Sequence, residues 1–158
     1  MTNKINTGNV IDVIEQEAIE AAQDTEQYEQ VDCPLVHTFT PGLYSRQITM
    51  RAGLLVTSET HKTEHQYILL KGVVSVWTEA EGEIIISAPY HGVTLPGTRR
   101  LLYIHEDAIW TCFHSTLLHT VAEIHEDIIE KYENPRLKGH YENNVFVPEK
   151  KTINHAKI

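Results

Sequence analysis

The sequence has no long apolar run, and none of its runs approaches the ~20 apolar residues that a membrane-spanning helix needs. Its first residues, MTNKINTGN, also lack the basic stretch followed by an apolar stretch that is typical of a signal peptide. We therefore expect a cytoplasmic protein with no membrane partner.

Basic residues are scarce: 13 Lys and Arg stand against 22 Asp and Glu, for a net charge of −9. Because contacts to phosphate groups need clustered Lys and Arg, we expect no nucleic-acid partner. Cysteine is equally sparse, and Cys33 and Cys112 show no C-x-x-C spacing. They are expected to be free thiols, with Cys112 in the core. The sequence also contains no Gly-rich phosphate loop and no G-x-S-x-G motif.

The chain has 158 residues, enough for one domain with short extensions. Residues 1–31 hold seven acidic residues and one basic residue, so this segment alone carries −6 of the net −9. Apolar residues recur there at three- and four-residue spacing after a possible cap at Asn9, which predicts a helix. Its apolar stripe is narrow. We expect an acidic helical arm that packs on the body or on a neighbouring subunit.

From about Tyr44 to His114 the sequence consists of short runs rich in Val, Ile, Tyr, Trp and Thr. Turn signals separate them at 52–53, 71–72, 80–82, 88–89, 96–97 and 106–107. This spacing predicts about eight antiparallel strands in a sandwich or small barrel. We divide the chain into the helical arm (1–31), an all-β barrel (32–115, opening with a connector at 32–42), a helix (116–134) and an irregular tail (135–158).

The stretch ETHKTEHQYILLKG, residues 59–72, is the richest in candidate site residues. Its HKTEH segment fits the H-x-x-E-H pattern of a zinc peptidase, which needs a helix. The β-rich flanks argue against a helix. In strands, Glu59 and His61 share a face, and a turn at 62–64 lets His65 open the next strand beside them. The three groups could then converge on non-haem Fe, Mn or Zn.

The same stretch resembles the first motif of the cupin family, G-x5-H-x-H-x3,4-E-x6-G. Gly53, Glu59, His61, His65 and Gly72 keep its spacing, with Glu and His exchanged at the first and third ligand positions. The resemblance covers roughly residues 40–115. It implies a jelly-roll barrel, which in this family serves enzymes, binding modules, storage proteins and regulators alike, and it implies a homodimer.

The family's second motif, G-x5-P-x-G-x2-H-x3-N, is matched only in part, by Gly92, Pro96, Gly97, Arg100 and Ile104. Arg100 stands where the family has its fourth ligand, and arginine does not bind metals. The block HKTEH…PGTRR…LYIHEDAIW is similar to small cupin-like proteins encoded by tailed phages. That likeness implies the host cytoplasm or a virion as location.

Several further residues complete the candidate site. His114 ends the last expected strand and is a further candidate metal ligand. Arg100 is expected either to hold an anionic ligand or to pair with Glu59. Tyr67 and Tyr103 are expected to line the cavity through strand alternation, although plain packing also fits both. Arg99 is expected to face solvent on the opposite side.

Three functions remain open at this point. The first is a metal-binding cupin, such as a non-haem metal enzyme, with a divalent metal (Fe, Mn or Zn) acting on a small anionic molecule. The second is a metal-free module that binds a carbohydrate or a small anion. The third is an assembly or accessory protein that uses the barrel as a scaffold and the helices as contacts. Whether the chain is an enzyme stays open.

Overall fold

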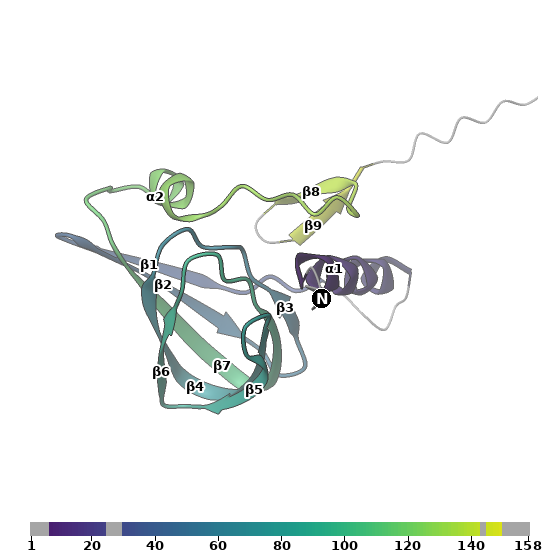
Figure 1. Cartoon of the computed structure of the whole chain (residues 1–158), viewed down its shortest axis with the longest axis horizontal. Coiled ribbons are helices and arrows are strands. Elements are labelled where there is room, and N and C mark those ends of the chain that lie inside the picture. Colours follow the sequence, from purple (N-terminus) through teal and green to yellow (C-terminus); the bar gives the residue numbers. More distant parts are fainter. Residues whose placement is uncertain (1–6, 25–29, 143–144, 150–158) are drawn as a thin grey trace, which may run out of the picture.

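The computed structural model describes residues 7–24, 30–142 and 145–149. The elements follow one another as α1 (Thr7–Asp24), β1 (Leu35–Thr40), β2 (Leu43–Met50), β3 (Leu55–Thr57), β4 (His65–Thr78), β5 (Gly82–Ser87), β6 (Tyr90–Thr94), β7 (Leu101–Ser115), α2 (Val121–Ile128), β8 (Gly139–Glu142) and β9 (Val145–Pro148). The predicted all-β class, an antiparallel barrel accompanied by two helices, is confirmed by these elements (Figure 1).

Two long strands, β4 and β7, run through both walls of the barrel. The first part of β4 pairs with β6 and with the second part of β7, which also pairs with β2. The second part of β4 pairs with β5 and with the first part of β7, which also pairs with β3. All these pairings are antiparallel. The sheet therefore curls into two layers, β1-β2-β7-β4-β6 and β3-β7-β4-β5, which enclose the core (Figure 1).

The bend between the layers lies at Gly72, where the β4–β7 register shifts. Gly72 has φ +95°, and a Cβ atom there would lie 2.5 Å from the backbone oxygen of Asp107. Only glycine fits such a close approach. The two turns expected at 71–72 and 106–107 are therefore wrong: both strands continue through these positions and bend.

Inward-facing and outward-facing side chains alternate along the long strands, as the period of a pleated strand requires. Leu69 and Val74 on β4 and Ile104 on β7 are fully buried, and Trp110 packs with them. Toward the start of β4 and the end of β7, the same inward face carries polar residues, His65 and His114. The barrel thus has an apolar interior and a polar end.

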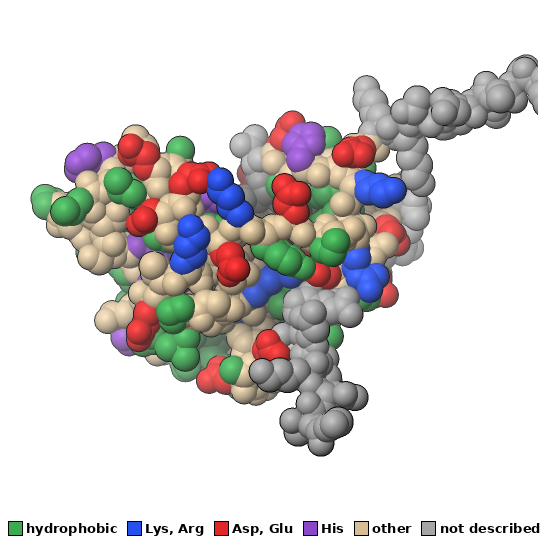
Figure 2. Space-filling view, turned by 45° about the horizontal axis from the view of Figure 1, so that its top comes forward, with side chains coloured by type: hydrophobic (Ala, Val, Ile, Leu, Met, Phe, Trp, Pro, Cys, Tyr) green, Lys and Arg blue, Asp and Glu red, His purple; other side chains and the backbone are tan. Residues whose placement is uncertain are grey.

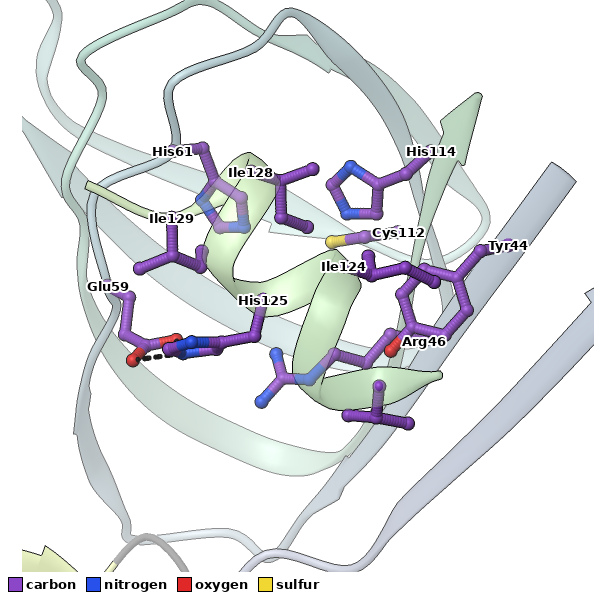
Figure 3. A pocket seen from close by; sticks show the side chains of 11 residues that line it. Tyr44, Arg46, Glu59, His61, Cys112, His114, Ile124, His125, Ile128 and Ile129 are labelled. Atoms are coloured by element: carbon purple, nitrogen blue, oxygen red, sulfur yellow. Dashed lines mark hydrogen bonds and ion pairs between the residues drawn. The ribbon is translucent and has the colours of Figure 1, made fainter. Parts of the chain in front are cut away.

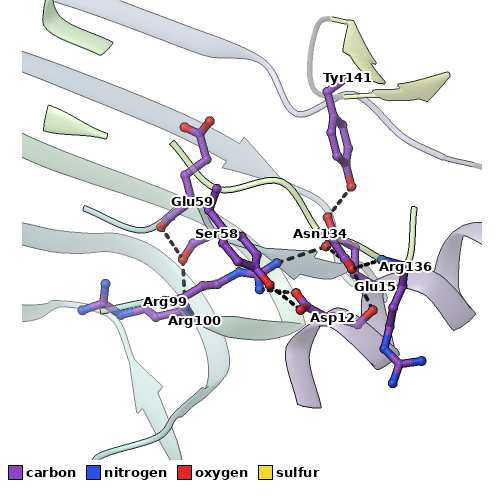
Figure 4. A network of polar contacts seen from close by, with 10 residues as sticks. Asp12, Glu15, Ser58, Glu59, Arg99, Arg100, Asn134, Arg136 and Tyr141 are labelled. Carbon is purple, nitrogen blue, oxygen red and sulfur yellow. Dashed lines mark hydrogen bonds and ion pairs between the residues drawn. The ribbon is translucent and has the colours of Figure 1, made fainter. Parts of the chain in front are cut away.

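Helix α1 docks on the barrel through its acidic face. Arg99 donates to Asp12 at 2.7 Å and to Glu15 at 3.0 Å, and both carboxylates are buried (Figure 4). Tyr132 and Tyr141 donate to the same two carboxylates. Arg99 is only 13% exposed, so its expected exposure to solvent is wrong. The acidic arm packs on the body of its own chain because this arginine lies opposite it.

Other boundaries also differ from the expectations. Helix α1 begins at Thr7, so Asn9 lies inside it. Helix α2 covers only 121–128 of the expected 116–134, because Thr120 caps its start and Ile129 turns into extended backbone. Where a connector and the first part of an irregular tail were expected, the chain forms β1 and the β8–β9 hairpin, and residues 150–158 of the expected tail lie outside the described residues. Among the described helices, none is long and apolar enough to cross a membrane.

Candidate metal centre

Three histidines gather at the polar end of the barrel. His65 is the first residue of β4 and His114 the penultimate residue of β7, and the pairing of Gln66 with Phe113 places them side by side on the inward face. His61 joins them from the loop before β4. One ring nitrogen from each lies within 4.8 Å of the other two.

The backbone around His61 is fixed on two sides. Its carbonyl accepts from the N–H of Gly97 at 2.8 Å, in the turn between β6 and β7. Its neighbours Thr60 and Lys62 bond to the chain just after α2 and at its last turn, and His61 itself forms a β-bridge with Ile129. The loop therefore holds the ring over the barrel end without a helix. This geometry excludes the zinc-peptidase interpretation of HKTEH, since His65 stands in a strand.

One ring nitrogen of each histidine is fully buried and has no hydrogen-bond partner among the described residues: Nδ1 of His61, Nε2 of His65 and Nδ1 of His114. The other nitrogen of His65, Nδ1, donates to the carbonyl oxygen of Thr63 at 3.1 Å. In the neutral ring this bond leaves the lone pair on Nε2, the buried nitrogen that has no partner among the described residues. Such a second bond is the usual way in which proteins orient a metal-binding histidine.

The cluster is uncharged at neutral pH. Burial, and then the neighbouring imidazoles, lower the pKa of His61 from 6.5 to about 3. Burial and His65 lower the pKa of His114 to about 4, and burial also lowers the pKa of His65. Neutral imidazole is the form that binds a metal. The residues therefore fit a divalent metal in number, protonation and orientation.

A small cavity of about 40 Å³ lies beside His61 and His114 (Figure 3). Helix α2 covers it with Ile124 and Ile128, which are buried against Tyr44 of β2. The remaining lining residues are Arg46, Glu59, Cys112, Val121, His125 and Ile129. The cavity thus has one wall of imidazoles and one apolar wall.

Two arginines bring positive charge to this end of the barrel. Arg100 is only 8% exposed: its Nη2 donates to Thr94 at 2.9 Å, and its guanidinium lies over the rings of Tyr67 and Trp110 at 5.0 and 5.7 Å. Arg46 lines the cavity. Both charges contribute to the lowered pKa of His61. Neither arginine forms an ion pair within the described part of the chain.

Other candidate residues lie apart from the cluster. Glu59 accepts from His125 of α2 at 2.9 Å and is 53% exposed, so its carboxylate is engaged outside the three-histidine set (Figure 3). The expected Glu59–Arg100 ion pair does not form. Tyr103 is 44% exposed because Leu102 and Ile104 take the inward face, so it does not line the cavity. Tyr67 is buried inside the barrel, under Arg100.

Sequence reasoning missed Arg46 and the covering role of α2. The signal for Arg46 was present: in LYSRQITM, Tyr44, Arg46, Ile48 and Met50 alternate on one face, so the apolar members predict that the arginine also points inward. The role of α2 has no local signal, because it depends on where the chain returns after β7.

No protein-family model matches the chain, and no curated protein matches it either. Among solved structures it is similar to a cupin-2 domain protein from Shewanella frigidimarina (TM-score 0.42, 12% identity, 57% of this chain and 86% of that one). It is also similar to a cupin 2 domain-containing protein from Halorhodospira halophila (0.47, 14%, 59% and 69%) and to the DMSP lyase DddQ from Ruegeria pomeroyi (0.49, 14%, 65% and 56%). These likenesses, all with TM-scores below 0.5, carry no argument about function. None of these three supports the expected likeness to phage proteins.

Proposed function

We propose that this protein binds one divalent metal ion through His61, His65 and His114, and that the metal acts on a small molecule in the adjoining cavity. One observation carries the proposal: three histidines that each bring a ring nitrogen within 4.8 Å of the others also each keep a buried ring nitrogen with no partner among the described residues. A buried polar atom without a hydrogen bond costs about 1–3 kcal/mol, so three of them together require an explanation.

A metal explains all three nitrogens at once. Zinc, iron and manganese, the ions expected from the sequence, all accept imidazole ligands, and catalytic zinc sites use three protein ligands and keep a further position for water or substrate. In such a position the ion would supply Lewis-acid chemistry, polarising an oxygen atom of the bound molecule. Three protein ligands therefore favour a reactive centre over a closed structural one.

The chain's own residues would shape the rest of the site. Ile124 and Ile128 of α2 cover one side of the cavity with apolar surface, and a lower local dielectric strengthens electrostatic interactions there. The hydrogen bond from His125 to Glu59 ties α2 to the loop that carries His61. The loop and the helix would therefore keep the third ligand in place.

A metal-free pocket for a small anion is the second candidate. It is favoured by Arg46 and Arg100, whose charges have no counter-ion among the described residues and oppose the entry of a cation. Under this alternative, a small anion would bind equally well with a chelator present. Under the metal proposal it would not.

Metal content tests the proposal directly. The protein is purified without an affinity tag, incubated with Fe(II), Mn(II) or Zn(II), dialysed and analysed by mass spectrometry. We expect close to one ion per chain in the wild type and in the control His119→Ala, an exposed histidine. His61→Ala and His65→Ala should lose the metal while circular dichroism shows an unchanged fold. Absence of metal from the wild type under all three conditions contradicts the proposal.

The homodimer stays a prediction. It is supported by the outer β1–β2 edge of the sheet, where Val36, Phe39 and Leu43 are 40–54% exposed. Sedimentation at micromolar concentration distinguishes a dimer from a monomer, and Val36→Lys should shift the equilibrium toward the monomer.

On the face shown in Figure 2, acidic and basic side chains are interspersed without a broad basic patch.

A further inference from the structure

With a metal bound, the charge around the candidate centre would be predominantly positive. Three neutral imidazoles add no negative charge, so a divalent ion would keep its two positive charges, and Arg46 and Arg100 add two more. Glu59, the carboxylate that lines the cavity, accepts a hydrogen bond from His125 and offsets only one of these four positive charges. Protein metal sites of low dielectric need their charge balanced. The described residues leave that balance to something that comes from outside the chain.

Arg46 is placed to hold such a group. It lies on the inward face of β2, between Tyr44 and Ile48, and its backbone pairs with Cys112, two residues before His114. Its side chain lines the same cavity as His61 and His114, and Figure 3 shows it extending below Ile124 into that pocket. Its guanidinium group has no hydrogen bond or ion pair within the described ranges. A guanidinium group offers five donors in a planar fork that matches a carboxylate.

The cavity limits the size of the ligand. A volume of about 40 Å³ holds roughly three water molecules, or a molecule of a few non-hydrogen atoms. Its apolar wall, formed by Val121, Ile124 and Ile128, suits a methyl or methylene group. These features together fit a short-chain monocarboxylate with its charge toward Arg46 and its carbon end under α2.

We infer that the three-histidine centre takes up its metal together with a small carboxylate held by Arg46, and that the two ligands bind cooperatively. This inference rests on the proposed metal function. Its reason is mutual charge compensation: the carboxylate offsets the repulsion between the ion and Arg46, and the ion adds attraction for the carboxylate. Because such coupling is reciprocal, each ligand must raise the affinity for the other by the same factor.

The inference also predicts that the effect of Arg46 on metal affinity changes sign when a carboxylate is added. Without a carboxylate, Arg46 only repels the metal, so Arg46→Gln should bind metal as tightly as the wild type or more tightly. With a carboxylate, the wild type should gain affinity while Arg46→Gln gains little. A purely structural role for Arg46 would produce neither effect, since loss of fold would weaken metal binding under both conditions.

The experiment measures Zn(II) affinity by chelator competition in a buffer with perchlorate as the only small anion. Acetate or propionate is then added, with acetamide as the neutral analogue and a correction for direct binding of carboxylate to zinc. Arg51→Gln, an exposed arginine beyond the end of β2, is the matched control for net charge. We expect a roughly tenfold gain in zinc affinity with acetate or propionate in the wild type and in Arg51→Gln. We expect no gain with acetamide and less than a twofold gain in Arg46→Gln.

The outcomes separate this inference from the proposal beneath it. Zinc affinity that is the same with and without carboxylate, or an undiminished gain in Arg46→Gln, overturns the inference and leaves the metal centre standing. No zinc binding under any condition overturns the metal centre itself.

Discussion

Replacing His114 by leucine should stabilise the metal-free protein while abolishing its response to metal. The Nδ1 atom of His114 is buried without a partner, and the residue is only 3% exposed. Leucine has a similar size and no polar atom. It therefore removes a desolvation penalty of about 1–3 kcal/mol, less whatever is lost through imperfect packing.

For a chain of this size, each kcal/mol shifts the midpoint of thermal unfolding by roughly 2–4 °C. The metal-free variant is thus expected to unfold several degrees above the metal-free wild type. A metal at about one thousand times its dissociation constant should stabilise the wild type by about 4.1 kcal/mol and leave the variant unchanged, so the order of stability reverses.

The assay is calorimetry with and without a chelator, and His119→Leu, at an exposed position, serves as the control. A metal-free His114→Leu protein that unfolds well below the wild type would refute the reasoning, because the imidazole would then be contributing favourable contacts. A reversal that also occurs in His119→Leu would refute it as well.

Three further predictions follow from the same structure. The metal-free protein should lose stability as the pH falls below 6.5. The pKa values of His61 (about 3) and His114 (about 4) in the folded protein lie below those in the unfolded chain, so the unfolded state takes up protons first. Unfolding midpoints measured between pH 7 and 5 test this, and a midpoint that does not change with pH would contradict it. Arg99→Gln should lower the free energy of unfolding by about 3–5 kcal/mol, because it leaves the two buried carboxylates of α1 without their cation. Denaturant titration measures this loss, and a loss below about 1 kcal/mol would mean that α1 docks by other contacts. Gly72→Ala should cost more than about 1 kcal/mol through its positive φ and the contact with the facing strand, and a neutral effect in the same titration would argue against the bend at this residue.

The fold class was predictable because strand period and turn chemistry act locally. The turns expected at Ala52-Gly53 and Pro96-Gly97 form, and both glycines have positive φ. Gly72 also has positive φ, but it serves a bend inside a continuous strand, and a sequence signal for glycine does not separate these two uses. Strand β1 was missed because an edge strand, exposed along most of its length, lacks the apolar alternation that marks a half-buried one.

The sequence identified the three histidines of the candidate site, but their arrangement in space was not predictable from it. The sequence places His61 and His65 near each other, but the approach of His114 depends on the antiparallel pairing of β4 and β7, some fifty residues apart. Glu59 lines the cavity together with His61, although neither lies in one of the strands, and its carboxylate accepts a hydrogen bond from His125 of α2. No local pattern specifies where α2 returns, so this choice of partner lies beyond sequence reasoning.

The central claim is that these three histidines hold one divalent metal, and anomalous diffraction tests it most directly. Crystals of the zinc-loaded protein, measured on both sides of the zinc edge, should show one anomalous peak per chain. One nitrogen each from His61, His65 and His114 should lie about 2.0–2.1 Å from that peak. A peak bound by Glu59 and His125 at the surface, or none inside the barrel, would contradict the account.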